Sequence, residues 1–155
     1  MGYTQPPNLS EEEIQSLLKE ATIARICSLN QDGTIHAATV SFKHKAGRIL
    51  IATPKASRKA RNLQRDGRVT VLVDVVGEKA SDFRGAIVYG KAVVQELTLA
   101  DFISINETFM PADRVEEWTL RFLDLTDWLL ISVHPAHTAS WDYAKDEELA
   151  ALFQD

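Results

Sequence analysis

The residues best suited to chemistry lie in one short basic segment, TPKASRKARNLQRDGRVTVLVD at residues 53–74. Between positions 55 and 68 six side chains are basic and only Asp66 is acidic, so this stretch carries a net charge of +5 in a chain whose total is −5. A compact positive segment in an acidic protein favours a small, localised anion over a long polyanion. The basic residues are Lys55, Arg58, Lys59, Arg61, Arg65 and Arg68.

The beginning of this segment contains the groups that hold a phosphate. Thr53 offers a hydroxyl at the end of a predicted strand, and Ser57 is a typical N-cap for a helix over residues 58–65. The first N–H groups of a helix have no partner inside it and bind anions readily. Arg58 and Lys59 stand in the first turn, where the helix dipole makes each cation unfavourable by about 0.3 to 1 kcal/mol. A dianionic ligand offsets this cost, whereas a solvated basic face is the alternative that composition leaves open.

The composition is that of an ordinary folded protein. With 155 residues, 45% hydrophobic and 25% charged, the chain is expected to form a single domain over residues 1–155. Its single cysteine, Cys27, excludes an intramolecular disulfide framework, and we expect it to be inert in the core. Apolar runs are too short for a membrane span, and the N-terminal residues lack the features of a signal peptide. We therefore expect a soluble, cytoplasmic protein.

Other kinds of site find little support. His134 and His137 flank a proline and have no clustered cysteine or carboxylate, so no metal site is expected. The overall acidity and the lack of aromatic residues over 54–68 argue against nucleic-acid binding. A basic helix that docks on RNA or an acidic partner is one hypothesis for the function of the basic segment. No nucleophile with a base, and no dinucleotide-type glycine loop, can be proposed from spacing, so any chemistry belongs to a cofactor.

The elements that must position these residues are mostly short strands separated by turn signals. A helix over 10–20 opens with a capping box, and Pro111 splits a helical region over 98–122 whose N-caps we predict at Thr98 and Asp113. Gly85 and Gly90 are expected to mark a bulge or a close approach by another backbone or a ligand. Strands are predicted at 22–29, 34–43, 48–53, 68–76, 83–97, 128–135 and 137–143, and a short acidic helix over 144–155. This pattern predicts a mainly β, α+β fold built as an antiparallel closed or split barrel.

The segment ILIATPKASRKARNLQRDGRVTVLV, residues 49–73, resembles the flavin-phosphate segment of the pyridoxamine 5′-phosphate oxidase family. That family has a strand ending in Thr, a short loop, Ser-Arg-Lys-Ala, a short helix and an Arg-Val strand. The resemblance is strongest over 48–75 and collinear over about 22–97. It implies an FMN-binding split β-barrel that forms a homodimer with the flavin at the subunit interface.

Carried over residue by residue, the resemblance places Ser57, Arg58 and Lys59 on the FMN phosphate. Thr53 and the backbone of Ala52 are implied beside the ribityl chain. The strand HAATVSF, 36–42, is implied along the isoalloxazine edge, and HTASW, 137–141, is similar to a late strand with a Trp near the flavin. Gly85 departs from the family, which often has a flavin-contacting Gln there. The further candidate contacts are His36, Thr39, Ser41 and Trp141.

The resemblance implies an FMN-dependent oxidoreductase that exchanges hydride or electrons with a small-molecule substrate. After Trp141 the chain reads DYAKDEELAALFQD, where the oxidase has an Arg and His segment for the substrate phosphate. Acidic residues repel a phosphorylated substrate, so we do not expect oxidation of pyridoxamine phosphate. A deazaflavin coenzyme is the alternative to FMN, with haem as a further possibility. The alternative function is a flavin, deazaflavin or haem carrier or sensor without turnover.

Overall fold

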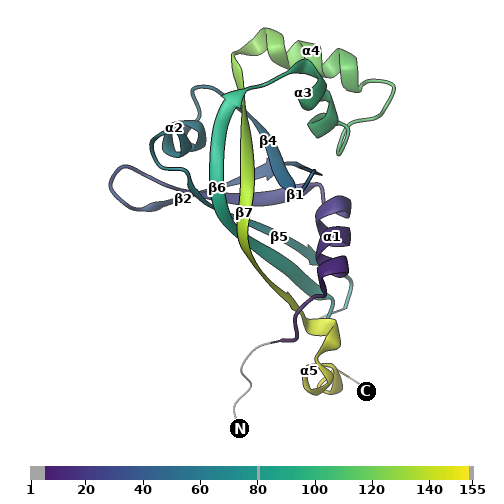
Figure 1. The fold of residues 1–155 in the computed structure, drawn as a ribbon. Helices are drawn as coiled ribbons and strands as arrows, with labels where there is room; N and C mark the ends of the chain where they lie inside the picture. Colours follow the sequence, from purple (N-terminus) through teal and green to yellow (C-terminus); the bar gives the residue numbers. More distant parts are fainter. Residues whose placement is uncertain (1–5, 80, 154–155) are drawn as a thin grey trace.

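The computed structural model describes residues 6–79 and 81–153, and its main feature is a curled antiparallel sheet (Figure 1). Seven strands are paired in the order β2-β1-β5-β6-β7-β4-β3. The predicted fold class, an α+β antiparallel split barrel, is confirmed. The strands are β1 Ile23–Leu29, β2 Ile35–Ser41, β3 Lys43–Lys45, β4 Arg48–Pro54, β5 Arg68–Val76, β6 Phe83–Glu96 and β7 Trp128–Asp142. The helices are α1 Glu11–Glu20, α2 Arg58–Arg65, α3 Leu99–Asn106, α4 Val115–Leu125 and α5 Glu147–Ala151, with a 3₁₀ turn at Tyr143–Lys145.

The main core lies inside the curl of the sheet. Alternate residues of each strand point inward, because side chains alternate between the two faces of a strand. Leu17 and Leu18 of α1 and Leu63 of α2 pack against this core. Burial of this apolar surface drives the sheet to curl around it. Its fully buried members include Ile26, Phe42, Ile49, Ile51, Val71, Val73, Ala86, Ile131 and Val133.

A smaller aromatic cluster joins α3 and α4 to the start of β7. Phe102 lies 4.9 Å from the Trp128 ring, centroid to centroid, and Phe122 lies 5.8 Å from the same ring. The Thr98 cap is confirmed, since its hydroxyl accepts the Asp101 N–H at 3.1 Å. The Asp113 cap is wrong: α4 begins after Arg114, which makes no side-chain capping hydrogen bond.

The last strand, β7, is continuous where two strands were predicted. Pro135 pairs with Gly90 and His137 pairs with Tyr89, so a β-bulge at Ala136 next to the proline lets the strand continue without ending. The predictions for both glycines are confirmed. A Cβ on Gly90 would lie 2.2 Å from the His134 carbonyl oxygen, and one on Gly85 would lie 2.8 Å from the Val73 carbonyl oxygen and 2.4 Å from the Trp141 ring.

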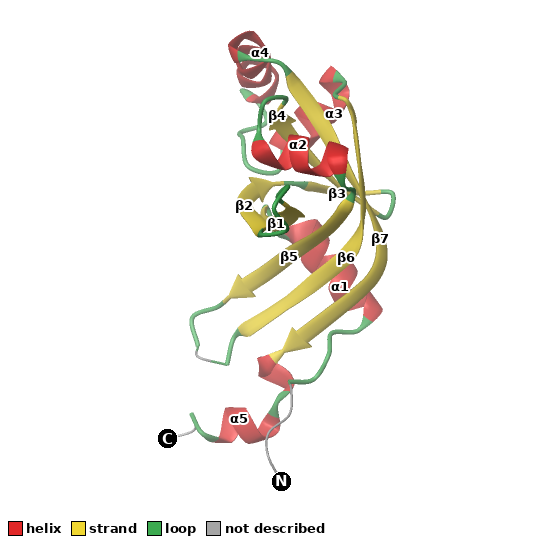
Figure 2. Cartoon of the chain, turned by 90° about the vertical axis from the view of Figure 1, so that its left-hand side faces the viewer, coloured by secondary structure: helices red, strands yellow, loops and turns green. Residues whose placement is uncertain are grey.

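The outer face of the sheet, formed by β1, β5, β6 and β7, is uncovered in the described part of the chain. Figure 2 shows the lower parts of β5, β6 and β7 with no helix in front of them. Large apolar side chains are exposed along it, among them Val76 at 63% and Tyr89 at 42%. Its charged pair is Arg25 with Asp74. We call this surface the outer face below.

Candidate functional site

The junction between β4 and α2 forms a small cradle of hydroxyl and N–H groups. The chain turns after Pro54, and Ser57 then adopts extended backbone angles and caps α2, its hydroxyl accepting the Ala60 N–H at 3.2 Å. Thr53, which is fully buried, shares a 2.8 Å hydrogen bond between its hydroxyl and that of Ser57. The predicted cap is therefore confirmed, and Thr53 holds the capping side chain in place.

The first turn of α2 leaves donors and charge without a counterpart. Among the described residues, the N–H groups of Arg58 and Lys59 have no hydrogen-bond acceptor, as expected for a helix start. The turn contains no acidic residue. Neither Arg58 nor Lys59 forms an ion pair within the part of the chain that the structure describes. The cradle is therefore a positive, donor-rich surface suited to an anion.

Lys59 differs from an ordinary surface lysine. Its side chain is half-buried, and burial lowers the pKa of its ammonium group because water no longer solvates the charge fully. Arg58 is exposed beside it. An anion bound in the cradle would neutralise Lys59 and favour its charged form.

The other basic residues of the segment are engaged elsewhere or stay on the surface. Arg68 holds the Asp66 carboxylate with its Nε and Nη2 groups, which lowers the pKa of Asp66 to about 2. Arg65 donates to the Leu29 carbonyl at 2.6 Å. Arg61 is exposed. Arg58 and Lys59 stand in the first turn of α2 without an ionic partner among the described residues. Lys55, which is exposed in the loop before the helix, likewise forms no ion pair there.

The candidate residues of β2 are divided between two faces of the sheet. His36 pairs with the buried Ser28 of β1, and Ser28 is bonded to α2, so His36 lies on the α2 side. Thr39 and Ser41 alternate with it and lie on the outer face. Ala52 packs away from the main core, against the small cluster beneath α3. The structure thus places His36 on the side of the sheet that α2 covers, and Thr39 and Ser41 on the opposite face.

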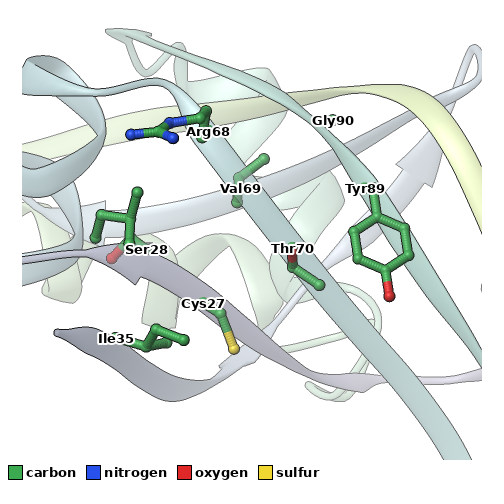
Figure 3. A pocket seen from close by; sticks show the side chains of 9 residues that line it. Cys27, Ser28, Ile35, Arg68, Val69, Thr70, Tyr89 and Gly90 are labelled. Carbon is green, nitrogen blue, oxygen red and sulfur yellow. The ribbon is translucent and has the colours of Figure 1, made fainter. Parts of the chain in front are cut away.

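The outer face carries a pocket that the sequence did not indicate. Its volume is about 310 Å³ and it opens between β1, β2, β5 and β6 (Figure 3). Cys27, Thr70 and Tyr89 lie side by side on adjacent strands, and the Tyr89 ring stacks on His137 at 6.0 Å between centroids. The expectation that Cys27 is buried in the core is wrong, because its side chain is half-exposed on the opposite face of β1. The full lining is Cys27, Ser28, Leu29, Ile35, Arg68, Val69, Thr70, Tyr89 and Gly90.

Trp141 lies far from the cradle within one chain. Its ring lies over Gly85, its partner in β6. Thr53 pairs with Leu129 at the start of β7, and Trp141 follows twelve residues later in the same strand. Twelve residues of extended strand span roughly 40 Å. Figure 1 likewise shows the end of β7 far below α2.

Neither a membrane-spanning helix nor a metal-binding cluster is found among the described residues. No helix there is both long and apolar enough to cross a membrane. Within the same ranges, no three His, Cys, Asp or Glu side chains gather closely enough to hold a metal ion.

Comparisons with known proteins identify the relationship of the chain. A family model described as pyridoxamine 5′-phosphate oxidase matches residues 10–104. No curated protein sequence matches the chain. Among solved structures, a conserved hypothetical protein from Mycobacterium tuberculosis superposes with a TM-score of 0.78 at 24% identity, over 92% of each chain.

Two other solved structures with the same fold have different names. One named F420 reductase has a TM-score of 0.64 at 18% identity, covering 83% of this chain and 98% of its own. The heme storage protein from Vibrio cholerae has a TM-score of 0.66 at 14% identity, covering 85% of this chain and 93% of its own. At such identities these likenesses show a shared fold.

Proposed function

Because the chain belongs to the pyridoxamine 5′-phosphate oxidase family, we propose that it is a homodimeric FMN-binding oxidoreductase acting on a small organic molecule. The observation that carries this proposal is the cradle at the start of α2. Ser57 is fixed there by Thr53, and Arg58 and Lys59 have no anionic partner among the described residues. The cradle has the charge and the donors that a phosphate dianion requires.

Each residue of the cradle has a distinct role in this proposal. The N–H groups of Arg58 and Lys59 donate to phosphate oxygens, and their side chains supply the opposite charge. Ser57 accepts the Ala60 N–H and keeps the helix start open. FMN supplies the hydride and electron chemistry when bound, while the chain binds, orients and shields it.

A second copy of the chain completes the site in this proposal. The outer face exposes several large apolar side chains, among them Val76 and Tyr89, and such exposed apolar surface is typical of an interface. Trp141 lies too far from Thr53 in one chain to reach the same ligand. Two copies packed through their outer faces would bring the Trp141 end of one toward the cradle of the other. Thr39 and Ser41, which lie on this face, then belong to the interface.

The substrate is proposed to be uncharged or cationic. In the segment after Trp141, residues 142–148, four residues are acidic and one, Lys145, is basic. The buried Asp142 and Asp146 also serve as caps for Ala144 and Leu149. Glu147 and Glu148 follow them on the surface. A phosphorylated substrate is disfavoured beside these carboxylates. Pyridoxamine phosphate is therefore not the proposed substrate.

Titration of the purified protein with FMN and with riboflavin tests the phosphate assignment. FMN should bind roughly 100-fold more tightly, because charge-assisted hydrogen bonds to the phosphate are missing in riboflavin. Quenching of flavin fluorescence measures both affinities. Equal affinities would show that the cradle does not hold the phosphate. Sedimentation of the same samples tests the homodimer.

The absorption spectrum of the purified protein and the identity of its released chromophore separate the candidate cofactors. A flavin spectrum supports FMN, whereas a deazaflavin or haem spectrum favours the alternative cofactors. Reduction by a nicotinamide donor and reoxidation by candidate acceptors then distinguishes an enzyme from a carrier or sensor.

We further propose that residues 1–155 form one domain, since one sheet runs through its described part. The single cysteine fits a cytoplasmic location.

A further inference from the structure

A buried hydrogen-bond network joins the middle of α2 to the end of β1. Asn62 is only 3% exposed, yet every polar group of its side chain is paired. Its Nδ2 group donates to the Ser28 hydroxyl at 3.1 Å and to the Asn30 side-chain carbonyl at 3.0 Å. Its Oδ1 accepts from Arg65 at 3.0 Å, and Arg65 also donates to the Leu29 carbonyl at 2.6 Å. We call these five residues the Asn62 clamp.

The clamp continues into the hairpin between β1 and β2. The Asn30 side chain donates to the Thr34 hydroxyl at 3.0 Å, and that hydroxyl donates to Asp32 at 2.6 Å. The hydrogen bonds of Thr34 lower the Asp32 pKa, and the charge of Arg58 adds a smaller effect. The chain of hydrogen bonds therefore runs from α2 into the β1–β2 hairpin.

The rest of α2 offers less to fix its direction. Its apolar anchors are Ala60 and Leu63, and the remaining side chains of the helix are polar or charged. Apolar contacts are non-directional and permit small rotations of a short helix. Hydrogen bonds require both a distance and an angle. The Thr53–Ser57 hydrogen bond fixes the start of α2, and Asn62 is the contact in the middle of the helix that sets its rotation relative to the β1–β2 hairpin.

We infer that Asn62 is a positioning residue of the anion cradle, locking α2 to the β1–β2 hairpin so that Ser57, Arg58 and Lys59 keep one orientation. The hydrogen bonds of the Asn62 clamp form without a ligand, whereas the effect of the clamp on FMN affinity rests on the proposed function. Asn62 touches no phosphate in this scheme. It acts through the helix that carries the cradle.

The Asn62→Ala variant tests the inference by amide hydrogen exchange. Alanine favours a helix more than asparagine does, so any loosening of α2 must come from the lost clamp. Exchange at residues 60–61 and at residues 30, 33 and 34 should become roughly tenfold faster, because the hydrogen bonds of these amides open more often once the clamp is lost. Unchanged exchange in both segments overturns the inference, whether or not the protein binds a flavin.

Asn106, a buried asparagine in α3, provides a matched control. Asn106 is 2% exposed and donates to the Thr119 hydroxyl at 2.8 Å, joining α3 to α4. Asn106→Ala should destabilise the fold comparably but leave exchange in α2 unchanged. Faster exchange in α2 of this control would mean that Asn62→Ala reports general loosening, which overturns the specific role.

The ratio of FMN to riboflavin affinity gives a second readout. In Asn62→Ala this ratio should fall roughly tenfold, while riboflavin affinity itself changes little. Asn106→Ala should keep the ratio of the unmodified protein. An unmodified protein that binds FMN, with the same ratio in Asn62→Ala, overturns the positioning role. A protein that binds no FMN instead overturns the proposed function, and the exchange readout still decides the lock.

A milder variant keeps the test decisive where Asn62→Ala fails to fold. Ser28→Ala removes one acceptor of the clamp and leaves the bonds of Asn62 to Asn30 and Arg65 intact. Its effects on exchange and on the affinity ratio should have the same direction and be smaller. No change in either quantity argues against the clamp.

Discussion

The N-termini of α1 and α2 have similar caps and opposite charges. Ser10 caps α1 by accepting the Glu13 N–H at 3.1 Å, and Ser57 caps α2 by accepting the Ala60 N–H at 3.2 Å. The first turn of α1 contains Glu11, Glu12 and Glu13, whereas the first turn of α2 contains no acidic residue. Acids stabilise a helix start and bases destabilise it.

The two helix N-termini differ in whether residues of the chain compensate their charge. The Glu13 carboxylate accepts the Ser10 N–H at 3.0 Å and a hydrogen bond from the Lys145 ammonium. The hydrogen bonds at the start of α1 are therefore made within the chain. At α2 the cations Arg58 and Lys59 add to the positive end of the dipole. The first end contributes to stability. The second is less favourable by itself, and in the proposed function the phosphate of FMN compensates for this.

The largest expected effect comes from removing both cations of α2. Arg58→Ala combined with Lys59→Ala should weaken FMN binding on the order of 100-fold or more, since two charge-assisted contacts are lost. Riboflavin affinity should change little. The free energy of unfolding without ligand should stay equal or rise, because cations leave a positive helix end. Fluorescence titration and chemical denaturation measure these quantities.

The matched change in α1 is the control for this prediction. Glu11→Ala combined with Glu12→Ala also removes two charges from a helix start, but here they are favourable ones. It should lower stability slightly and leave FMN affinity unchanged. Equal affinity losses in the two double variants would contradict the contrast between the helix ends.

Substitution of each capping serine should separate the structural role of the cap from its role in FMN binding. Ser10→Ala and Ser57→Ala should each lower the free energy of unfolding by about 1 kcal/mol, as expected for a lost N-cap. Only Ser57→Ala should also weaken FMN binding, by roughly tenfold, because Thr53 then loses the hydroxyl that it holds against the cradle. Unchanged FMN affinity in Ser57→Ala would leave Ser57 as a structural cap only.

The sequence predicted these helix ends well because capping is local. Ser10 with Glu13 and Ser57 with its following turn are readable within four residues. The sheet order was less accessible, yet short turns between successive strands favoured an antiparallel barrel. Asp113 failed as a cap because the chain there turns one residue later, at Arg114.

Tertiary placement accounts for what the sequence could not predict. Cys27 sits in an apolar strand, and strand alternation alone does not say which face the sheet curls around. The bulge beside Pro135 joins two predicted strands into β7, and this continuity places Trp141 far from Thr53. Asn62 carried no signal, because its partners lie more than thirty residues away in β1 and its hairpin.

Alkaline pH should affect the α2 end selectively. Burial lowers the pKa of Lys59 below its usual value of 10.5, and a bound phosphate raises it again. FMN binding therefore takes up a proton in the window between the two values, and affinity falls there by at most about tenfold per pH unit. Without ligand, stability rises with pH in the window below 10.5, because the unfolded chain holds the extra proton.

Lys59→Arg is the variant that checks this origin. An arginine keeps its charge across the whole range, so its FMN affinity should lack the Lys59 contribution to the pH profile. Titration of the flavin itself would appear in both proteins and cancels in the comparison. Identical profiles would exclude Lys59 as the titrating group.

Acidic pH should affect the α1 end instead. The Lys145 hydrogen bond, followed by those of Ser10, lowers the pKa of Glu13 from 4.5 to about 2. Its contribution to stability is therefore complete above pH 4.5 and is lost as the pH falls from 4.5 toward 2. Denaturation across this range should show a smaller pH dependence in Glu13→Gln than in the unmodified protein.

The smallest expected effect concerns an acid in the hairpin to which α2 is hydrogen-bonded. Asp32, in the β1–β2 hairpin, feels the charge of Arg58 without forming an ion pair with it in the described residues. Asp32→Asn should strengthen FMN binding by roughly two- to fivefold, because exposed charges interact weakly and this one opposes the phosphate. The gain should shrink in high salt, as screening removes the repulsion that Asp32 exerts. Weaker binding in Asp32→Asn would instead assign Asp32 to holding the hairpin through Thr34, with no net electrostatic influence on the cradle.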